Sequence, residues 1–108
     1  ILKAKQYLLE CVDSSNNIGL YRSTNNKLVL MVNDTEYQTN LEFTNNMWHT
    51  VGLSFTSMIS SDSFSVTYNV YFRVVLNNQK YEISSQLNGL PNNLKLSIGR
   101  KYNDEKII

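Results

Sequence analysis

Apolar and polar residues alternate along most of this chain, and no stretch shows the spacing of an amphipathic helix. The clearest alternation lies between residues 66 and 76, where one face is apolar and carries Val66, Tyr68, Val70, Phe72, Val74 and Leu76. Such a segment is typical of a β-strand with one buried face. A strand of eleven residues spans about 36 Å, so we expect it to bend across the domain.

Seven further apolar segments are separated by clusters of Asn, Ser and Asp, whose side chains favour turns. The predicted strands are Tyr7–Val12, Ile18–Arg22, Lys27–Val32, Glu36–Thr39, Trp48–Thr56, Val66–Leu76, Lys80–Ser84 and Leu94–Gly99. Asn77 and Asn78 predict a tight hairpin, because asparagine tolerates a left-handed backbone. Many short strands at this spacing predict an all-β fold, an antiparallel β-sandwich made of curved sheets.

The composition and charge of the chain exclude some classes of function. The chain has 108 residues and a net charge of +1 with no basic block, so we expect one domain that binds no nucleic acid. No apolar run is long enough for a membrane helix, so we expect no membrane insertion. The single cysteine, Cys11, excludes an internal disulfide and lies in an apolar run, where a buried, inert thiol is expected. The abrupt ends resemble an excised segment, so we expect flanking domains.

Catalytic patterns are absent from the sequence. One histidine, His49, is available as a base, and no Gly-x-Ser-x-Gly motif occurs. The glutamates at positions 10, 36, 42 and 82 lie on different strands, where solvent-facing side chains are expected rather than the paired acids of a glycosidase. The sequence therefore predicts a protein that is not an enzyme.

Trp48 and His49 stand side by side at the head of an apolar run, so a catalytic, a metal-binding and a structural role must be weighed. His49 falls on the same strand face as Val51 and Phe55, which favours a hydrogen-bonded core histidine. Trp48 falls on the opposite phase, and a bulge or an edge position would let both rings be buried. We interpret the pair as structural.

Four segments together resemble laminin-G-like, concanavalin-type jelly rolls. They are MWHTVGLSF (residues 47–55), the hairpin VVLNNQ (74–79), the closing strand LKLSIGR (94–100) and the strand pair IGLYRSTNNKLVLMV (18–32). The resemblance implies a single laminin-G-like domain over residues 1–108, in which the Trp-His pair serves architecture. Val75 and Asn78 stand where the family has an aromatic residue and a glycine, and the terminal strands are not evident. The domain is therefore expected to be incomplete at both ends.

The resemblance also implies a possible calcium site at one rim, formed by an acid that follows the strand LVLMV. Asn33 and Asp34 occupy that place, and loops expected at the same rim would add Asp13 and Asp62. Calcium requires six or more oxygen ligands. The other interpretation is that Asp34 is simply a turn residue.

The leading functional hypothesis is a non-catalytic module that recognises a glycan or a protein surface in an extracellular, cell-surface or virion-associated protein. The candidate ligand-binding residues are Asn16, Asn17, Asn33, Asp34 and Tyr37. Tyrosines 21, 37, 71 and 81 are either stacking platforms for sugars or simply good strand formers. The competing hypothesis is a docking module of a larger assembly, such as an adhesin, a toxin or a phage tail or neck protein, without a small ligand.

Overall fold

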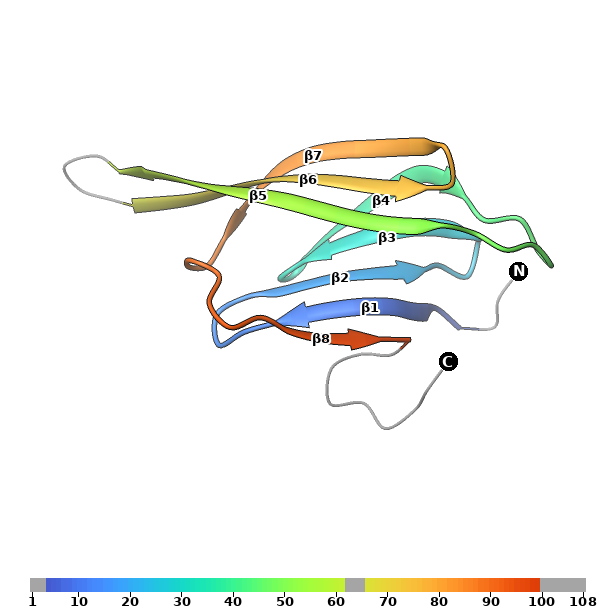
Figure 1. The fold of residues 1–108 in the computed structure, drawn as a ribbon, viewed down its shortest axis with the longest axis horizontal. Coiled ribbons are helices and arrows are strands. Elements are labelled where there is room, and N and C mark those ends of the chain that lie inside the picture. Colours follow the sequence, from blue (N-terminus) through green and yellow to red (C-terminus); the bar gives the residue numbers. More distant parts are fainter. Residues whose placement is uncertain (1–3, 62–65, 100–108) are drawn as a thin grey trace.

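A computed structural model describes residues 4–61 and 66–99 of the chain and shows an antiparallel β-sandwich (Figure 1). The first sheet has five strands in the order β4-β3-β2-β1-β8, and the second has three in the order β5-β6-β7. Their bounds are β1 Gln6–Val12, β2 Asn17–Arg22, β3 Lys27–Val32, β4 Thr35–Glu42, β5 Val51–Ser61, β6 Val66–Leu76, β7 Gln79–Leu87 and β8 Lys95–Ile98. The predicted fold class, an all-β antiparallel sandwich, is confirmed, and each predicted strand overlaps an observed one.

Asparagines close the turns between neighbouring strands. Asn77 has a φ of 56° and lies between the paired residues Leu76 and Gln79, which confirms the predicted hairpin. Asn33 has a φ of 53° at the equivalent place between β3 and β4. Asparagine reaches this left-handed region more readily than most residues, so the sequence can close tight turns with few glycines.

The core lies between the two sheets and is built from the alternating apolar positions. β6 contributes Val70, Phe72, Val74 and Leu76, and β2 and β3 contribute the facing aliphatic side chains Ile18, Leu20, Leu28, Leu30 and Val32. Val66 has the predicted phase but is exposed. The reason is that β5 and β6 project past the other strands instead of bending across the domain as predicted (Figure 1).

The two sides of the sandwich differ. On one side β4 and β7 meet, and the hydroxyl groups of Tyr37 and Ser85 lie 2.8 Å apart. We call this the closed side. On the other side β5 is the edge of its sheet, while β1 and β8 extend beyond it in the opposite sheet (Figure 1). Leu96 and Ile98 of β8 are 59% and 74% exposed there. We call this the open side.

The prediction that Trp48 begins a strand and is buried is wrong. β5 begins at Val51, and the preceding segment is a loop with Asn46 at a φ of 60°. Trp48 is 99% exposed in this loop. His49 is half-buried rather than a core residue; its Nε2 accepts the backbone N–H of Thr44 at 3.0 Å. This bond holds the loop away from strand geometry, so the indole has no layer against which to pack.

Candidate functional site

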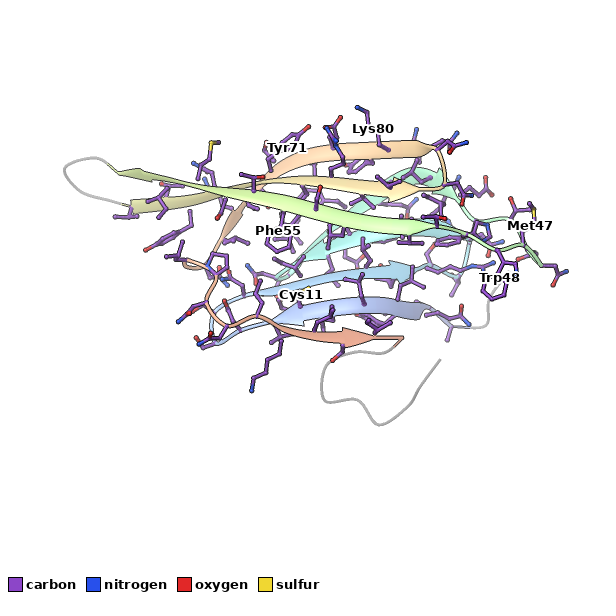
Figure 2. All side chains as sticks on the ribbon, in the orientation of Figure 1. Cys11, Met47, Trp48, Phe55, Tyr71 and Lys80 are labelled. Atoms are coloured by element: carbon purple, nitrogen blue, oxygen red, sulfur yellow. The ribbon has the colours of Figure 1, made fainter. Side chains whose placement is uncertain are left out.

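Two ends of the sandwich carry candidate sites. The predicted rim loops do gather at one end, which we call the asparagine end: the β1–β2 turn, the β3–β4 turn and the β7–β8 loop lie there together (Figure 1). The loop around Trp48 lies at the opposite end, which we call the tryptophan end (Figure 2).

Three of the five predicted ligand-binding residues line one cavity of about 290 Å³ at the asparagine end, namely Asn17, Asn33 and Asp34. Asn33 Oδ1 accepts the backbone N–H of Asn17 at 2.8 Å, which fixes the two turns relative to each other. Asn17 Oδ1 is buried and has no hydrogen-bond partner among the described residues. A buried acceptor without a partner is costly to the free energy of folding.

Acidic and aromatic side chains complete the wall of this cavity, which Tyr7, Glu10 and Glu36 also line. Glu10 is buried, so the prediction that it faces solvent is wrong. It lies on the strand face opposite the core, where its side chain lies next to Gly19, which has no side chain of its own to displace it.

Tyr21 is also buried, so it is not an exposed stacking platform. Burial, together with a hydrogen bond to Glu36 and the charge of that carboxylate, raises the pKa of Tyr21 to about 12. The ring packs 5.5 Å from that of Tyr7, and the ammonium of Lys5 lies over both rings. This cluster stabilises the outer face of the five-stranded sheet and leaves little aromatic surface for a ligand.

The other two predicted residues have structural contacts. Asn16 is buried, donates to the carbonyl of Gly89 at 3.0 Å and accepts the backbone N–H of Asn88 at 2.9 Å. Tyr37 is the residue that joins the sheets on the closed side. Neither lines the cavity of Asn17.

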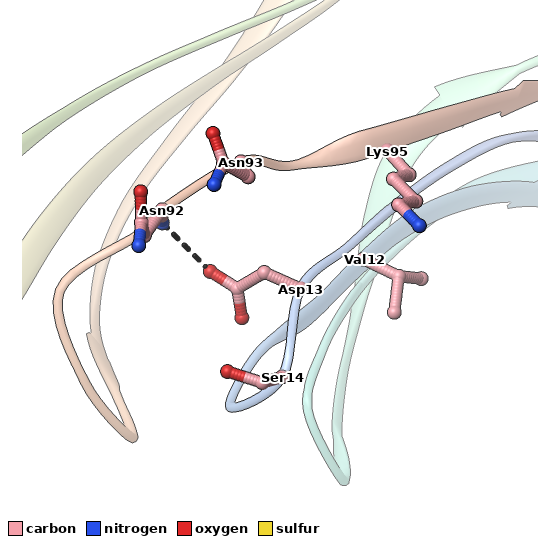
Figure 3. A pocket seen from close by; sticks show the side chains of 6 residues that line it. All are labelled: Val12, Asp13, Ser14, Asn92, Asn93 and Lys95. Carbon is pink, nitrogen blue, oxygen red and sulfur yellow. Dashed lines mark hydrogen bonds between the residues drawn. The ribbon is translucent and has the colours of Figure 1, made fainter.

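Two of the acids named for the implied calcium site, Asp13 and Asp34, do not line the same cavity. Asp13 lines a different cavity, of about 390 Å³ (Figure 3). Its Oδ1 accepts the backbone N–H groups of Ser15 and Asn16, and its Oδ2 accepts that of Asn92 at 2.9 Å. Partial burial raises the pKa of Asp13, but these backbone bonds outweigh it and the net shift is downward.

Asp34 lines the cavity of Asn17, and Asp62 lies outside the described residues. Within residues 4–61 and 66–99, no three His, Cys, Asp or Glu side chains are placed to hold a metal. Calcium binding at Asp34 therefore stays a prediction.

At the tryptophan end, a cavity of about 330 Å³ is lined by Arg22, Thr44, Asn46, Met47 and Trp48. Met47 is 65% exposed and Trp48 is 99% exposed, and both side chains point away from the sheets (Figure 2). Large apolar side chains are normally withdrawn from water. Two adjacent ones in the same loop form a candidate contact surface.

Arg22, which lines this cavity, is fixed in place by several contacts. The guanidinium of Arg22 donates to Asn26 Oδ1 and to Asn45 Oδ1, in each case at 2.8 Å from Nη2. It also lies 5.0 Å from the ring centre of Phe43, which in turn packs edge-on against His49. The loop that carries Trp48 is therefore held by contacts on both sides of this residue, at Asn45 and at His49.

Sequence reasoning missed Trp48 as a surface residue because the alternation of β5 can be extended back to it. The signal that could have identified the loop is the pair Asn45-Asn46 directly before Met47, since paired asparagines mark turns elsewhere in this chain.

The remaining ionisable cluster is a surface network. Arg73 Nη2 and Lys80 Nζ lie 3.2 and 3.4 Å from carboxylate oxygens of Glu82, and Tyr71 donates a hydrogen bond to the same carboxylate. This exposed cluster lies on the outer face of the three-stranded sheet, away from every cavity described above. Cys11 is half-buried, and burial followed by the charge of Glu10 raises the pKa of its thiol, which disfavours the thiolate.

Comparison with family models, with curated proteins and with solved structures found no match to this chain. The part of the chain that the structure describes contains no helix able to cross a membrane.

Proposed function

We propose that this chain is a non-catalytic recognition module that binds a glycan at the tryptophan end. The observation that carries the proposal is the exposure of Trp48 beside a polar cavity. An indole can bury about 150–250 Å² when it is covered, and here that surface is left in water. A ligand that covers the ring would recover the lost hydrophobic contribution.

The chemistry around Trp48 suits a sugar. The apolar face of a pyranose ring can stack on the indole, while hydroxyl groups bond to polar side chains. Thr44 and Asn46 supply a hydroxyl and an amide in the same cavity. Its volume of about 330 Å³ is at the lower end of small-ligand sites, as expected for one or two sugar rings.

The fold resemblance supports the same class of function. We propose that the sandwich is a laminin-G-like, concanavalin-type jelly roll within a larger protein displayed outside a cell or on a virion. The ordered segments named above carry this proposal, and the eight-strand antiparallel sandwich is compatible with it. A docking module without a small ligand remains the alternative, and the open side favours it.

The test is a glycan array followed by titration of the best ligand, with Trp48 as the fluorescent reporter because it is the only tryptophan. We expect the emission of Trp48 to shift to shorter wavelength when a sugar covers the ring. Trp48→Ala should abolish binding without changing the melting temperature, because the side chain has almost no packing to lose. Met58→Ala is the matched control, since it removes an exposed apolar side chain of β5.

The Asp34→Asn variant distinguishes a glycan site at the asparagine end from one at the tryptophan end. If Asp34→Asn abolishes glycan binding and Trp48→Ala does not, the site is the cavity of Asn17 and our location is wrong. If the wild-type protein binds nothing on the array, glycan recognition itself is wrong.

A further inference from the structure

Within the described residues the two sheets have four edge strands, and three of these edges are protected. Exposed edges are normally blunted by charge, irregular pairing or short length. β4 carries Glu36 and Glu42 and pairs irregularly with β3, β7 carries Lys80 and Glu82, and β8 has four residues. β5 has eleven residues, no charged residue and no proline, and its register with β6 is continuous.

The backbone of β5 presents a regular row of hydrogen-bonding groups to this edge. The N–H of Asn77 donates to the carbonyl of Thr50 at 2.7 Å, so this pair is a hydrogen-bonded one. In an antiparallel ladder such pairs alternate with pairs whose N–H and C=O groups point away. The groups that point to the open edge therefore belong to Val51, Leu53, Phe55, Ser57 and Ile59.

Apolar surface lies next to this edge in the opposite sheet. Leu96 pairs with Cys11 and Ile98 pairs with Leu9, and paired residues share a face. Leu9 and Cys11 pack against the core, so Leu96 and Ile98 also face inward. They are exposed because the three-stranded sheet does not reach them.

We propose that the open side is a strand-addition site, at which an extended segment of a second polypeptide pairs with β5 and covers β1 and β8. The segment recognised would have alternating side chains, apolar ones over Leu96 and Ile98 and polar ones toward solvent. Main-chain hydrogen bonds would supply affinity, and alternate side chains would supply specificity. Because β5 has no charge, binding would depend little on salt.

A second copy of this chain fits the open side poorly. The five-stranded sheet extends past β5, by β1 and β8. If two copies joined their β5 edges in one sheet about a two-fold axis, these projecting strands would occupy the same space. The chain's own residues 100–108 match the required pattern poorly, since five of these nine residues are charged (Arg100, Lys101, Asp104, Glu105 and Lys106).

The probe is a synthetic peptide of about ten residues with alternating Val and Thr, a lysine at each end and blocked termini. Ser57→Pro is the test variant: it removes an N–H that points to the free edge, where proline is tolerated. Ser57→Ala is the matched control because it keeps that N–H. We expect the peptide to bind the wild-type protein and Ser57→Ala equally, and Ser57→Pro about tenfold more weakly or worse.

Amide chemical shifts provide a second readout that does not depend on the variant folding. Peptide binding should perturb Val51, Leu53, Phe55 and Ser57 of β5 together with Leu96 of β8. The Trp48→Ala variant should bind the peptide unchanged, so this proposal and glycan binding can fail separately.

Several results would overturn strand addition at β5. The first is no binding at peptide concentrations up to about 1 mM, where the binding free energy is only about 4 kcal/mol. The second is unchanged peptide affinity in a folded Ser57→Pro variant. The third is a set of chemical-shift perturbations that maps to β4 or β7. A dimer in sedimentation that the Ser57→Pro substitution dissociates would assign the edge to a second copy instead.

Discussion

The closed and open sides of this sandwich are built from the same kind of strand and yet differ in burial. On the closed side, Tyr37 of β4 reaches Ser85 of β7, and the sheets are joined by a hydrogen bond of 2.8 Å. On the open side, Leu96 and Ile98 face the same interior as the core leucines but remain exposed. The alternation of apolar and polar residues decides which face of the sheet a side chain lies on, whereas burial also requires a strand of the other sheet to cover that face.

The difference separates the parts of the molecule that hold the fold from the parts that we propose to contact other molecules. The core between β2, β3 and β6 holds the fold, because its apolar side chains are fully covered, and the closed side adds partly buried side chains such as Tyr37. The open side and the tryptophan end contribute little to stability, so they are available to contact other molecules. Substitutions on the two sides should therefore have unequal effects.

The largest contrast is expected between two leucines on the inner face of one sheet. Leu30 is fully buried, and Leu30→Ala should lower the free energy of unfolding by about 3–5 kcal/mol. Leu96→Ala should cost less than about 0.5 kcal/mol, as for other exposed positions. Urea denaturation of both variants measures the two values. Equal losses would mean that the open side is covered.

A smaller effect is expected at the contact that joins the sheets. Tyr37→Phe removes the hydroxyl that meets Ser85 and should cost about 1 kcal/mol. Ser85→Ala should cost a similar amount, and the double variant should cost less than the sum because both changes remove one bond. Additive losses in this double-mutant cycle would show that the contact does not hold the closed side together.

An effect of similar size, which also depends on pH, is expected for Asp13 at the asparagine end. Burial raises the pKa of Asp13, but the hydrogen bonds that its carboxylate accepts from the backbone N–H groups of Asn92, Ser15 and Asn16 outweigh this effect and lower the folded-state pKa below the ordinary value of 3.8. Its contribution to stability is therefore present above about pH 4 and is lost as the pH falls through the lowered pKa.

Asp13→Ala should cost about 1 kcal/mol at neutral pH. The difference from the wild-type protein should shrink in thermal melts recorded below about pH 3. A cost that stays constant down to acid pH would show that the ionised carboxylate does not hold these loops.

The strands could be predicted from the sequence because two local signals agree. Alternation marks each strand, and asparagines such as Asn33 and Asn77 mark the turns with left-handed backbone. Both signals act over a few residues, so tertiary contacts did not have to be known. The start of β5 was misplaced because the alternation also fits the loop before Val51.

The site was harder to predict, since burial depends on which strands cover one another. Asn17, Asn33 and Asp34 were grouped correctly because strand parity places their turns at one end. Glu10 and Tyr21 were expected to face solvent, but neighbouring side chains on the outer face of the sheet, among them Tyr7, cover them. The division into five and three strands, which creates the open side, is a tertiary property that no local pattern encodes.

Amide hydrogen exchange along β5 in the free protein tests the open side most directly. We predict an alternating pattern, in which the amides of Gly52, Ser54, Thr56 and Met58 are protected by bonds to β6 while those of Leu53, Phe55, Ser57 and Ile59 exchange rapidly. Uniform protection along β5 would contradict the account, because it would mean that another strand already occupies this edge.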